Sequence, residues 1–258
     1  MPRVVYIILL GVIQGITEFL PVSSSGHLVI AQRLFGIESP GAGLEIALHF
    51  GTLVAILAFY REELTRLLAP IFRPGIFLKS ESAKRIGLLI VASIPAGVVG
   101  ILFERYITSL FDTPRFAAGM LLVTAAILGA TALVRRRDTQ INLPRAVVIG
   151  LAQALAIVPG ISRSGSTIGF GRLLGIDAED AARFSFILAI PAIAGATLLE
   201  ILKHHTDLEF IFIIGTAAAA LVGYVALTLL IGTLKAGKLW AFAPYCAVVG
   251  IVGLIVLT

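Results

Sequence analysis

The first long apolar stretch of the chain contains a run of polar side chains whose types suit phosphate chemistry. Gln14 and Glu18 are four residues apart, so on a helix they lie one turn apart on the same face. An ionisable side chain such as Glu18 is costly inside an apolar membrane segment, and it is therefore a functional candidate by default. Pro21 ends this helix because it cannot continue the backbone ladder. The polar residues that follow it are Ser23, Ser24, Ser25 and His27.

These residue types are the ones that proton transfer and nucleophilic attack require. His27 titrates near neutral pH and suits general acid or base work. Ser24 is a candidate nucleophile, although it could instead hydrogen-bond a phosphate oxygen while water attacks. Structural alternatives exist for each residue. A serine at a helix start caps free N–H groups, a lone histidine can be a satisfied core residue, and Glu18 could pair with a helix neighbour.

A second polar run, PGISRSGST from Pro159 to Thr167, interrupts a later apolar stretch. At its centre is Arg163, with hydroxyls and a glycine amide around it near the start of a helix. Such an arginine is a phosphate receptor, because its planar fork, the neighbouring donors and the helix dipole all favour an anion. The alternative is an ion pair with a carboxylate such as Glu18, which an anion could join or displace.

Together the two runs supply an acid, a base, a nucleophile and an anion clamp, which is the combination that phosphoryl transfer needs. We therefore predict four catalytic residues: Glu18, Ser24, His27 and Arg163. Substrate-binding roles are predicted for Gln14, Ser23, Ser25, Ser162, Ser164, Gly165 and Thr167.

The two polar runs are related by an internal repeat. With a shift of 139 residues, Gly11–Ile37 aligns without gaps on Gly150–Ile176, and nine of the 27 positions are identical. Two unrelated apolar helices would not share their rare polar residues, so the alignment indicates duplication. We expect a single membrane domain over residues 1–258, with one repeat at approximately 1–134 and the second at approximately 145–258.

Composition predicts an all-α polytopic membrane protein. Hydrophobic residues make up 58% of the 258 and charged residues only 14%, against about a quarter in soluble domains. Six apolar runs are long enough to cross a bilayer. They are Leu44–Tyr60, Ile86–Phe103, Phe116–Val134, Arg183–Leu202, Glu209–Ile231 and Trp240–Leu257. The chain start, with Gln14 and Glu18 soon after it, is not expected to be a signal peptide. The single cysteine, Cys246, excludes an internal disulfide and a cysteine metal site.

The two interrupted stretches, Val4–Phe35 and Ala146–Leu174, are predicted to be re-entrant hairpins of two half-helices. Broken backbone survives at membrane depth only inside protein or beside a watery cavity. Three predicted spans separate the hairpins, and because three is odd the two copies enter from opposite faces. This is an inverted-topology repeat, in which the site lies near the midplane where the broken helices meet.

The distribution of basic residues predicts the orientation. Fourteen Lys and Arg residues fall on the side of the Arg61–Arg85 loop and five on the other. The basic side is cytoplasmic, so both termini and the mouth of the first hairpin are external and the second hairpin opens inward. Arg135, Arg136 and Arg137 then form a cytoplasmic anchor rather than a nucleic-acid patch.

Two pairs of residues that include histidine are weaker candidates. Glu45 and His49 are four residues apart near the external end of the first full span. They could line the site or bind metal, although a packing or mouth-lining role is favoured. His204 and His205 fall in an external loop and are expected to be solvated.

At these residues the sequence resembles the undecaprenyl-diphosphate phosphatase family of bacteria, also called the bacitracin-resistance family. The first matching motif is (E/Q)xxxE, here Gln14 to Glu18, which runs on through FLPVSSSGH to His27. The second is PGxSRSGxT, here Pro159 to Thr167. Where many members have a glutamate this chain has Gln14, which weakens a two-carboxylate metal site and leaves Glu18 as the sole acid of the pair.

The resemblance implies a phosphatase assisted by a divalent metal ion, Mg²⁺ or Ca²⁺, with Glu18 and Gln14 as ligands. Its substrate would be a C55 polyprenyl diphosphate, its site would open externally, and its role would be recycling of the peptidoglycan lipid carrier and bacitracin tolerance. A transporter or flippase of a polyprenyl phosphate lipid is the alternative, because inverted repeats with broken helices are frequent in transporters. No nucleic-acid partner is expected, and the oligomeric state, a homodimer included, stays open.

Overall fold

Every element of the described chain is helical, as the composition predicted. The computed structural model describes residues 2–35, 42–72, 77, 80–134, 139–204 and 209–257, and no strand occurs among them. Helices are expected where apolar runs meet lipid, because a helix satisfies all its backbone hydrogen bonds internally. The α-helices are α1 Arg3–Phe19, α2 Ser24–Phe35, α3 Ala42–Phe59, α4 Arg61–Leu68, α6 Glu81–Leu102, α7 Glu104–Phe111, α8 Pro114–Ala130, α9 Leu143–Leu155, α10 Arg163–Leu173, α11 Ala178–His204, α12 Phe212–Lys235 and α13 Ala243–Val256. Short 3-10 helices are η1 Ala69–Phe72, η2 Thr131–Leu133 and η3 Leu239–Phe242.

Several helices have the length and composition of membrane spans. Among the described residues there are five such helices, or up to six if the bent pair Gly43–Phe59 and Arg61–Phe72, with 73° between its halves, forms one span. The sequence prediction of a loop at Arg61–Arg85 is wrong in part. That segment contains α4 and η1, and α6 already begins at Glu81.

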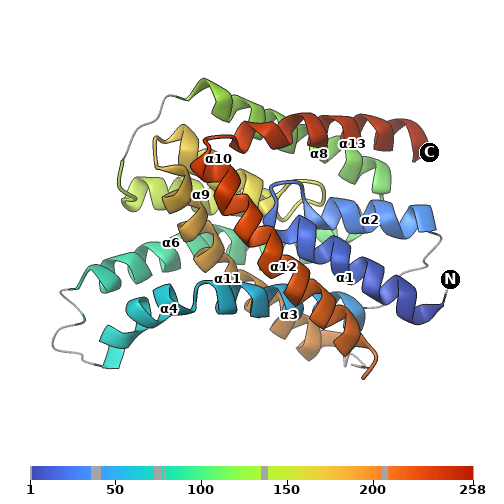
Figure 1. Cartoon of the computed structure of the whole chain (residues 1–258), viewed down its shortest axis with the longest axis horizontal. Coiled ribbons are helices and arrows are strands. Elements are labelled where there is room, and N and C mark those ends of the chain that lie inside the picture. The colour runs from blue at the N-terminus through green and yellow to red at the C-terminus, as the bar shows by residue number, and fades with distance from the viewer. Residues whose placement is uncertain are drawn as a thin grey trace.

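The two interrupted stretches fold as helical hairpins whose turns meet in the middle of the molecule. In Figure 1 the turn between α1 and α2 and the turn between α9 and α10 lie at the centre, while the helices run outward in opposite directions. The Ser164 hydroxyl joins the two turns by donating to the Leu20 carbonyl oxygen at 3.2 Å. Helices α2 and α10 begin at Ser24 and Arg163, 139 residues apart.

Small residues let the backbone of α1 pack directly against the backbone of α12. A Cβ atom at Gly11 would lie 2.6 Å from the Gly215 carbonyl oxygen, and one at Gly15 would lie 2.8 Å from that of Ala219. Small residues let helix backbones approach closely in a membrane, where dispersion rather than the hydrophobic effect drives association. Helix α13 packs on α8 in the same way through Gly250, whose Cβ would lie 2.9 Å from the Ala118 carbonyl oxygen.

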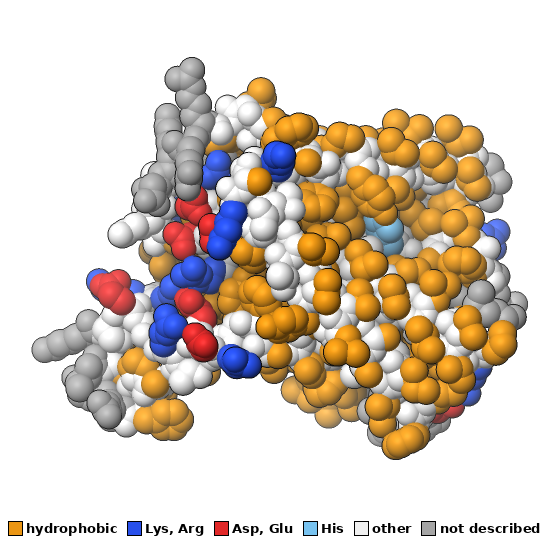
Figure 2. Space-filling model, in the orientation of Figure 1, with side chains coloured by type: hydrophobic (Ala, Val, Ile, Leu, Met, Phe, Trp, Pro, Cys, Tyr) orange, Lys and Arg blue, Asp and Glu red, His pale blue; other side chains and the backbone are white. Residues whose placement is uncertain are grey.

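On the face shown in Figure 2, Lys, Arg, Asp and Glu side chains gather toward one end, and hydrophobic side chains cover most of the rest. At the charged end Glu63 of α4 pairs with Arg85 of α6 at 3.1 Å and with Arg183 of α11 at 3.7 Å. Both termini lie at the opposite end (Figure 1). Several basic residues used in the sequence argument lie outside the described residues: Arg73, Lys79, Arg135, Arg136, Arg137 and His205, together with the side chains of Lys203 and His204.

Candidate active site

The centre of the site is an ion pair between the two hairpins. Arg163 Nη2 donates to Glu18 Oε1 at 2.5 Å, and the two side chains are only 16% and 7% exposed. Glu18 lies in the last turn of α1, and Arg163 is the first residue of α10. The alternative noted from the sequence, an arginine paired with Glu18, is therefore what the structure contains.

The second oxygen of Glu18 accepts two further hydrogen bonds. The Ser24 hydroxyl donates to Oε2 at 2.6 Å, and the Gln14 amide nitrogen donates to the same atom at 3.1 Å. The latter contact follows from the four-residue spacing of Gln14 and Glu18 on one helix face. The carboxylate thus connects Ser24, the candidate nucleophile, with Arg163, the candidate phosphate receptor.

The two helix starts at the site repeat the same hydrogen bonds. Ser23 Oγ accepts from the Gly26 amide at 3.3 Å, and Ser162 Oγ accepts from the Gly165 amide at 3.0 Å. In each copy the capping serine also lies 3.3 Å from the hydroxyl of the serine two residues later. Both helix N-termini therefore lie at the Glu18–Arg163 pair, where their dipoles favour an anion.

His27 is directed away from the carboxylate. Its Nδ1 lies 2.8 Å from the Ser23 carbonyl oxygen, and its Nε2 lies 2.9 Å from the hydroxyl of Tyr245 on α13. Both ring nitrogens are thus engaged outside the cluster of Glu18, Ser24 and Arg163. In this arrangement the acceptor for the Ser24 proton is Glu18, not His27.

Several buried polar atoms of the two hairpins lack a protein partner in the described part of the chain. They are Arg163 Nη1, Gln14 Oε1, Ser166 Oγ and both amide atoms of Gln153. A buried donor without a partner costs free energy, so these atoms indicate positions where a ligand or water completes the network. The unpartnered nitrogen of Arg163 is a donor of the kind that a phosphate oxygen would accept from.

Comparison with known proteins identifies the family of this chain. Residues 7–252 match the family model described as bacitracin resistance protein BacA. The chain belongs to the BacA family. A protein of Desulfosudis oleivorans named undecaprenyl-diphosphatase is 42% identical over 94% of each chain. Proteins of the same name from Halothermothrix orenii and Methanobrevibacter smithii are 43% and 38% identical, over 95% and 96% of each chain respectively.

In this BacA family member, three of the predicted substrate-binding hydroxyls make internal contacts. Ser162 caps α10 and Ser164 bonds to Leu20, as described above. Thr167 Oγ1 donates to the Arg163 carbonyl oxygen at 2.7 Å and lies 2.5 Å from the Ser185 hydroxyl. These bonds stabilise the start of α10, and a contact of the same residues with substrate stays a prediction.

Glu45 and His49 lie on α3, outside the cluster of hydrogen bonds. His49 Nδ1 lies 2.9 Å from the Glu45 carbonyl oxygen, and Gln32 Nε2 donates to the Glu45 carboxylate at 3.5 Å. Glu45 is exposed and His49 is half-buried. These contacts are compatible with the mouth-lining role favoured from the sequence.

Few protein side chains at the site could act as ligands for a metal ion. Across the described ranges no group of three or more His, Cys, Asp or Glu residues is placed to hold a metal. Gln14 Oε1 is a buried oxygen without a partner, and Glu18 is the adjacent carboxylate. Hard divalent cations commonly take one or two protein oxygens and complete their shell with substrate phosphates and water. Gln14 and Glu18 fit a metal only in that shared form.

Two residues that position the site were not found from the sequence. Tyr245 bonds to His27, and Thr124 of α8 accepts from the Ser162 amide at 2.9 Å and donates to the Gly160 carbonyl oxygen at 3.0 Å. Both lie inside apolar runs predicted as spans. A single polar side chain in such a run gives no signal of which neighbour it contacts.

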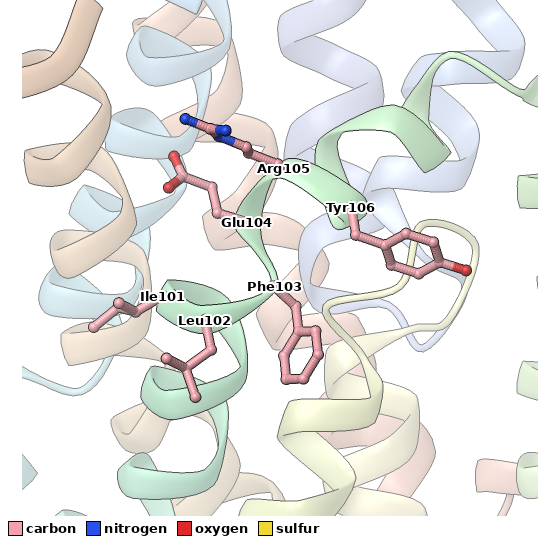
Figure 3. A pocket seen from close by; sticks show the side chains of 6 residues that line it. All are labelled: Ile101, Leu102, Phe103, Glu104, Arg105 and Tyr106. Carbon is pink, nitrogen blue, oxygen red and sulfur yellow. The ribbon is translucent and has the colours of Figure 1, made fainter.

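A surface hollow at the junction of α6 and α7 lies apart from this cluster. It is lined by Ile101, Leu102, Phe103, Glu104, Arg105 and Tyr106. These side chains point in different directions around the junction (Figure 3). The hollow contains none of the predicted site residues.

The buried ion pair generates a stability prediction. Arg163→Met should destabilise the protein by about 3–5 kcal/mol, because it leaves the Glu18 carboxylate buried and unpaired. Adding Glu18→Gln should recover part of this loss, since no uncompensated charge then remains. Unfolding in detergent of the wild type, both single variants and the double variant measures the coupling.

Arg66→Met is the control for this cycle, because Arg66 pairs with Glu62 at 3.2 Å with both side chains more than 70% exposed. It should change stability little. A double variant that is as unstable as the sum of the two single variants would contradict the pairing.

Proposed function

We propose that this chain is an integral membrane phosphatase that hydrolyses undecaprenyl diphosphate to undecaprenyl phosphate and inorganic phosphate. Relatives of nearly the same length and about 40% identity bear the name undecaprenyl-diphosphatase. This reaction regenerates the lipid carrier that peptidoglycan synthesis uses.

The observation that supports this proposal best is that only one of the two terminal nitrogens of the Arg163 guanidinium is bonded within the described part of the protein. Its Nη2 bonds to Glu18, while its Nη1 is buried without a partner among the described residues. A phosphoryl group bound to Nη1 would lie beside Ser24, because Ser24 and Arg163 bond to the same carboxylate. Positioning and charge neutralisation of this kind provide most of the catalysis in phosphoryl transfer.

In the proposed reaction Ser24 Oγ attacks the terminal phosphorus while its proton passes to Glu18. The bond between that phosphorus and the bridging oxygen breaks, and undecaprenyl phosphate leaves. Water then attacks the phosphorus of the phosphoserine and the bond to Ser24 Oγ breaks. Glu18 returns its proton to Ser24 Oγ, and the water provides the hydroxyl of the inorganic phosphate and releases its other proton. Arg163 and the N-terminal amides of α2 and α10 stabilise the charge on the transferring group. His27 does not bond to Ser24, so its proton transfer is assigned to the leaving oxygen or the attacking water.

Phosphate release by the purified protein tests the function. Undecaprenyl diphosphate in detergent should yield one phosphate for each undecaprenyl phosphate formed. Arg163→Lys should lower kcat by about 10²-fold, because lysine keeps the charge but lacks the planar fork. Ser24→Ala should abolish turnover and prevent any phosphoserine from being trapped by rapid acid quench.

Arg172→Lys is the matched control, since Arg172 lies on the same helix and donates to the Ile176 carbonyl oxygen at 2.9 Å. It should retain normal kcat. Folded Arg163→Ala protein with wild-type kcat would defeat the assignment and favour the flippase alternative. Partial turnover in Ser24→Ala would mean that water attacks directly.

A divalent cation, Mg²⁺ or Ca²⁺, is part of the proposal. Gln14 Oε1 and Glu18 would hold it together with diphosphate oxygens, and when bound it would neutralise phosphate charge. Gln14→Glu should lower the metal concentration that gives half-maximal activity, because a second carboxylate strengthens binding of a hard cation. Full activity of the wild type in excess chelator, or an unchanged metal requirement in Gln14→Glu, would argue against this site.

The membrane arrangement is also proposed. The chain would have six transmembrane segments and two re-entrant hairpins in the bacterial inner membrane, with both termini and the active-site opening external. The excess of basic residues at the charged end supports this orientation. In a Cys246→Ala background, an impermeant thiol reagent added to intact cells should label Ser109→Cys and leave Thr65→Cys unlabelled. Both positions are exposed, so the reverse pattern would reverse the orientation.

A further inference from the structure

His27 is held by two groups that the proposed chemistry does not use. The Ser23 carbonyl oxygen lies 2.8 Å from Nδ1, and the Tyr245 hydroxyl lies 2.9 Å from Nε2. The imidazole and phenol rings are nearly parallel, with an angle of 5° and 5.6 Å between centroids. The tyrosine thus restrains both the direction of Nε2 and the plane of the ring.

The first of these contacts selects the tautomer of the neutral ring. A carbonyl oxygen can only accept, so Nδ1 must carry the hydrogen. Nε2 is then the acceptor, and Tyr245 donates to it. When the ring is protonated, Nε2–H can donate to the same hydroxyl, because a phenol both donates and accepts. Tyr245 is therefore matched to both protonation states of His27, which no aliphatic side chain would be.

The backbone at Ser23, whose carbonyl group contacts His27, has an unusual conformation. Ser23 has φ of 70°, and it is the only non-glycine residue of the described chain with positive φ. Such a conformation is unfavourable for residues other than glycine. It lies at the turn whose carbonyl group bonds to His27. The next residue after the tyrosine, Cys246, contacts the same turn, with its thiol 3.6 Å from the Pro21 carbonyl oxygen.

The position of Tyr245 also separates it from the catalytic cluster. Tyr245 lies on α13 and is 48% exposed. Glu18 and Arg163, the charged residues of the catalytic cluster, pair with each other. No described contact links Tyr245 to either of them, so its effect on the reaction must pass through His27.

We propose that Tyr245 is a positioning residue for His27: its hydroxyl holds Nε2 in place by donating to the neutral ring and by accepting from the protonated ring. This inference rests on the proposed phosphatase function. The inference predicts that the two residues are coupled. Removal of the Tyr245 hydroxyl should lower kcat only in a protein that still contains His27. A tyrosine that merely packed α13 against the hairpin would affect both backgrounds equally.

Kinetics of four proteins test this coupling: wild type, Tyr245→Phe, His27→Ala and the double variant. Tyr245→Phe keeps the ring and loses the hydroxyl. We expect kcat to fall about tenfold with KM nearly unchanged, less than the roughly 10²- to 10⁴-fold cost of losing an acid or base itself. In the His27→Ala background the same change should have no further effect. Tyr224→Phe is the control, because Tyr224 is similarly exposed, at 46%, and its ring packs against Phe59.

Wild-type kcat in Tyr245→Phe, or an equal fall in both backgrounds, would overturn the proposal. Nitrogen NMR of labelled protein separates it from failure of the proposed function. The His27 Nε2 resonance should move in Tyr245→Phe and stay in place in Tyr224→Phe. If the wild type releases no phosphate but this shift occurs, the phosphatase assignment fails while the tyrosine–histidine contact stands. An unmoved resonance would rule out the contact itself.

Discussion

The ion pair between Glu18 and Arg163 is the constraint on which the rest of the site depends. Each partner alone would be an isolated charge in a low-dielectric interior. Neither hairpin can therefore bury its charged side chain without the other hairpin. The pair lies where two broken helices meet, and the freed polar groups of both turns satisfy one another there. The turns are also closely packed through glycines, because a Cβ atom at Gly26 would lie 3.1 Å from the Gly160 Cα. The result is a polar centre inside an apolar molecule, with one arginine nitrogen still available to a ligand.

The two halves share a scaffold and differ in chemistry. Both turns have the same serine cap and the same serine pair, yet Ser24 of the first corresponds to Arg163 of the second. Pure transport would not require an acid and a hydroxyl on one copy and a guanidinium on the other. Phosphoryl transfer uses both a nucleophile and a positive charge that holds the transferring group, and here each copy supplies one of them.

Sequence reasoning reached the helical architecture, and it singled out Gln14, Glu18, Ser24 and Arg163, which the structure joins by hydrogen bonds, because both inferences depend on composition and on rare polar residues. The contact between Gln14 and Glu18 follows from helix periodicity, and the break after Phe19 follows from Pro21. Other features depend on tertiary packing and could not be read from local patterns. Helix α4 lies in a segment predicted as a loop, since charged residues conceal its single apolar stripe. His27 was expected beside the nucleophile from its proximity in sequence, but the positive φ of Ser23 and the approach of α13 direct its ring to Tyr245.

An experimental structure with bound orthovanadate, a mimic of the phosphoryl group during transfer, tests the central claim most directly. The account predicts vanadate between the two helix N-termini, with one oxygen within hydrogen-bonding distance of Arg163 Nη1 and the vanadium next to Ser24 Oγ. Glu18 should remain within hydrogen-bonding distance of Ser24. Vanadate bound away from Arg163, or Glu18 and Arg163 on separate sides of the membrane, would contradict it.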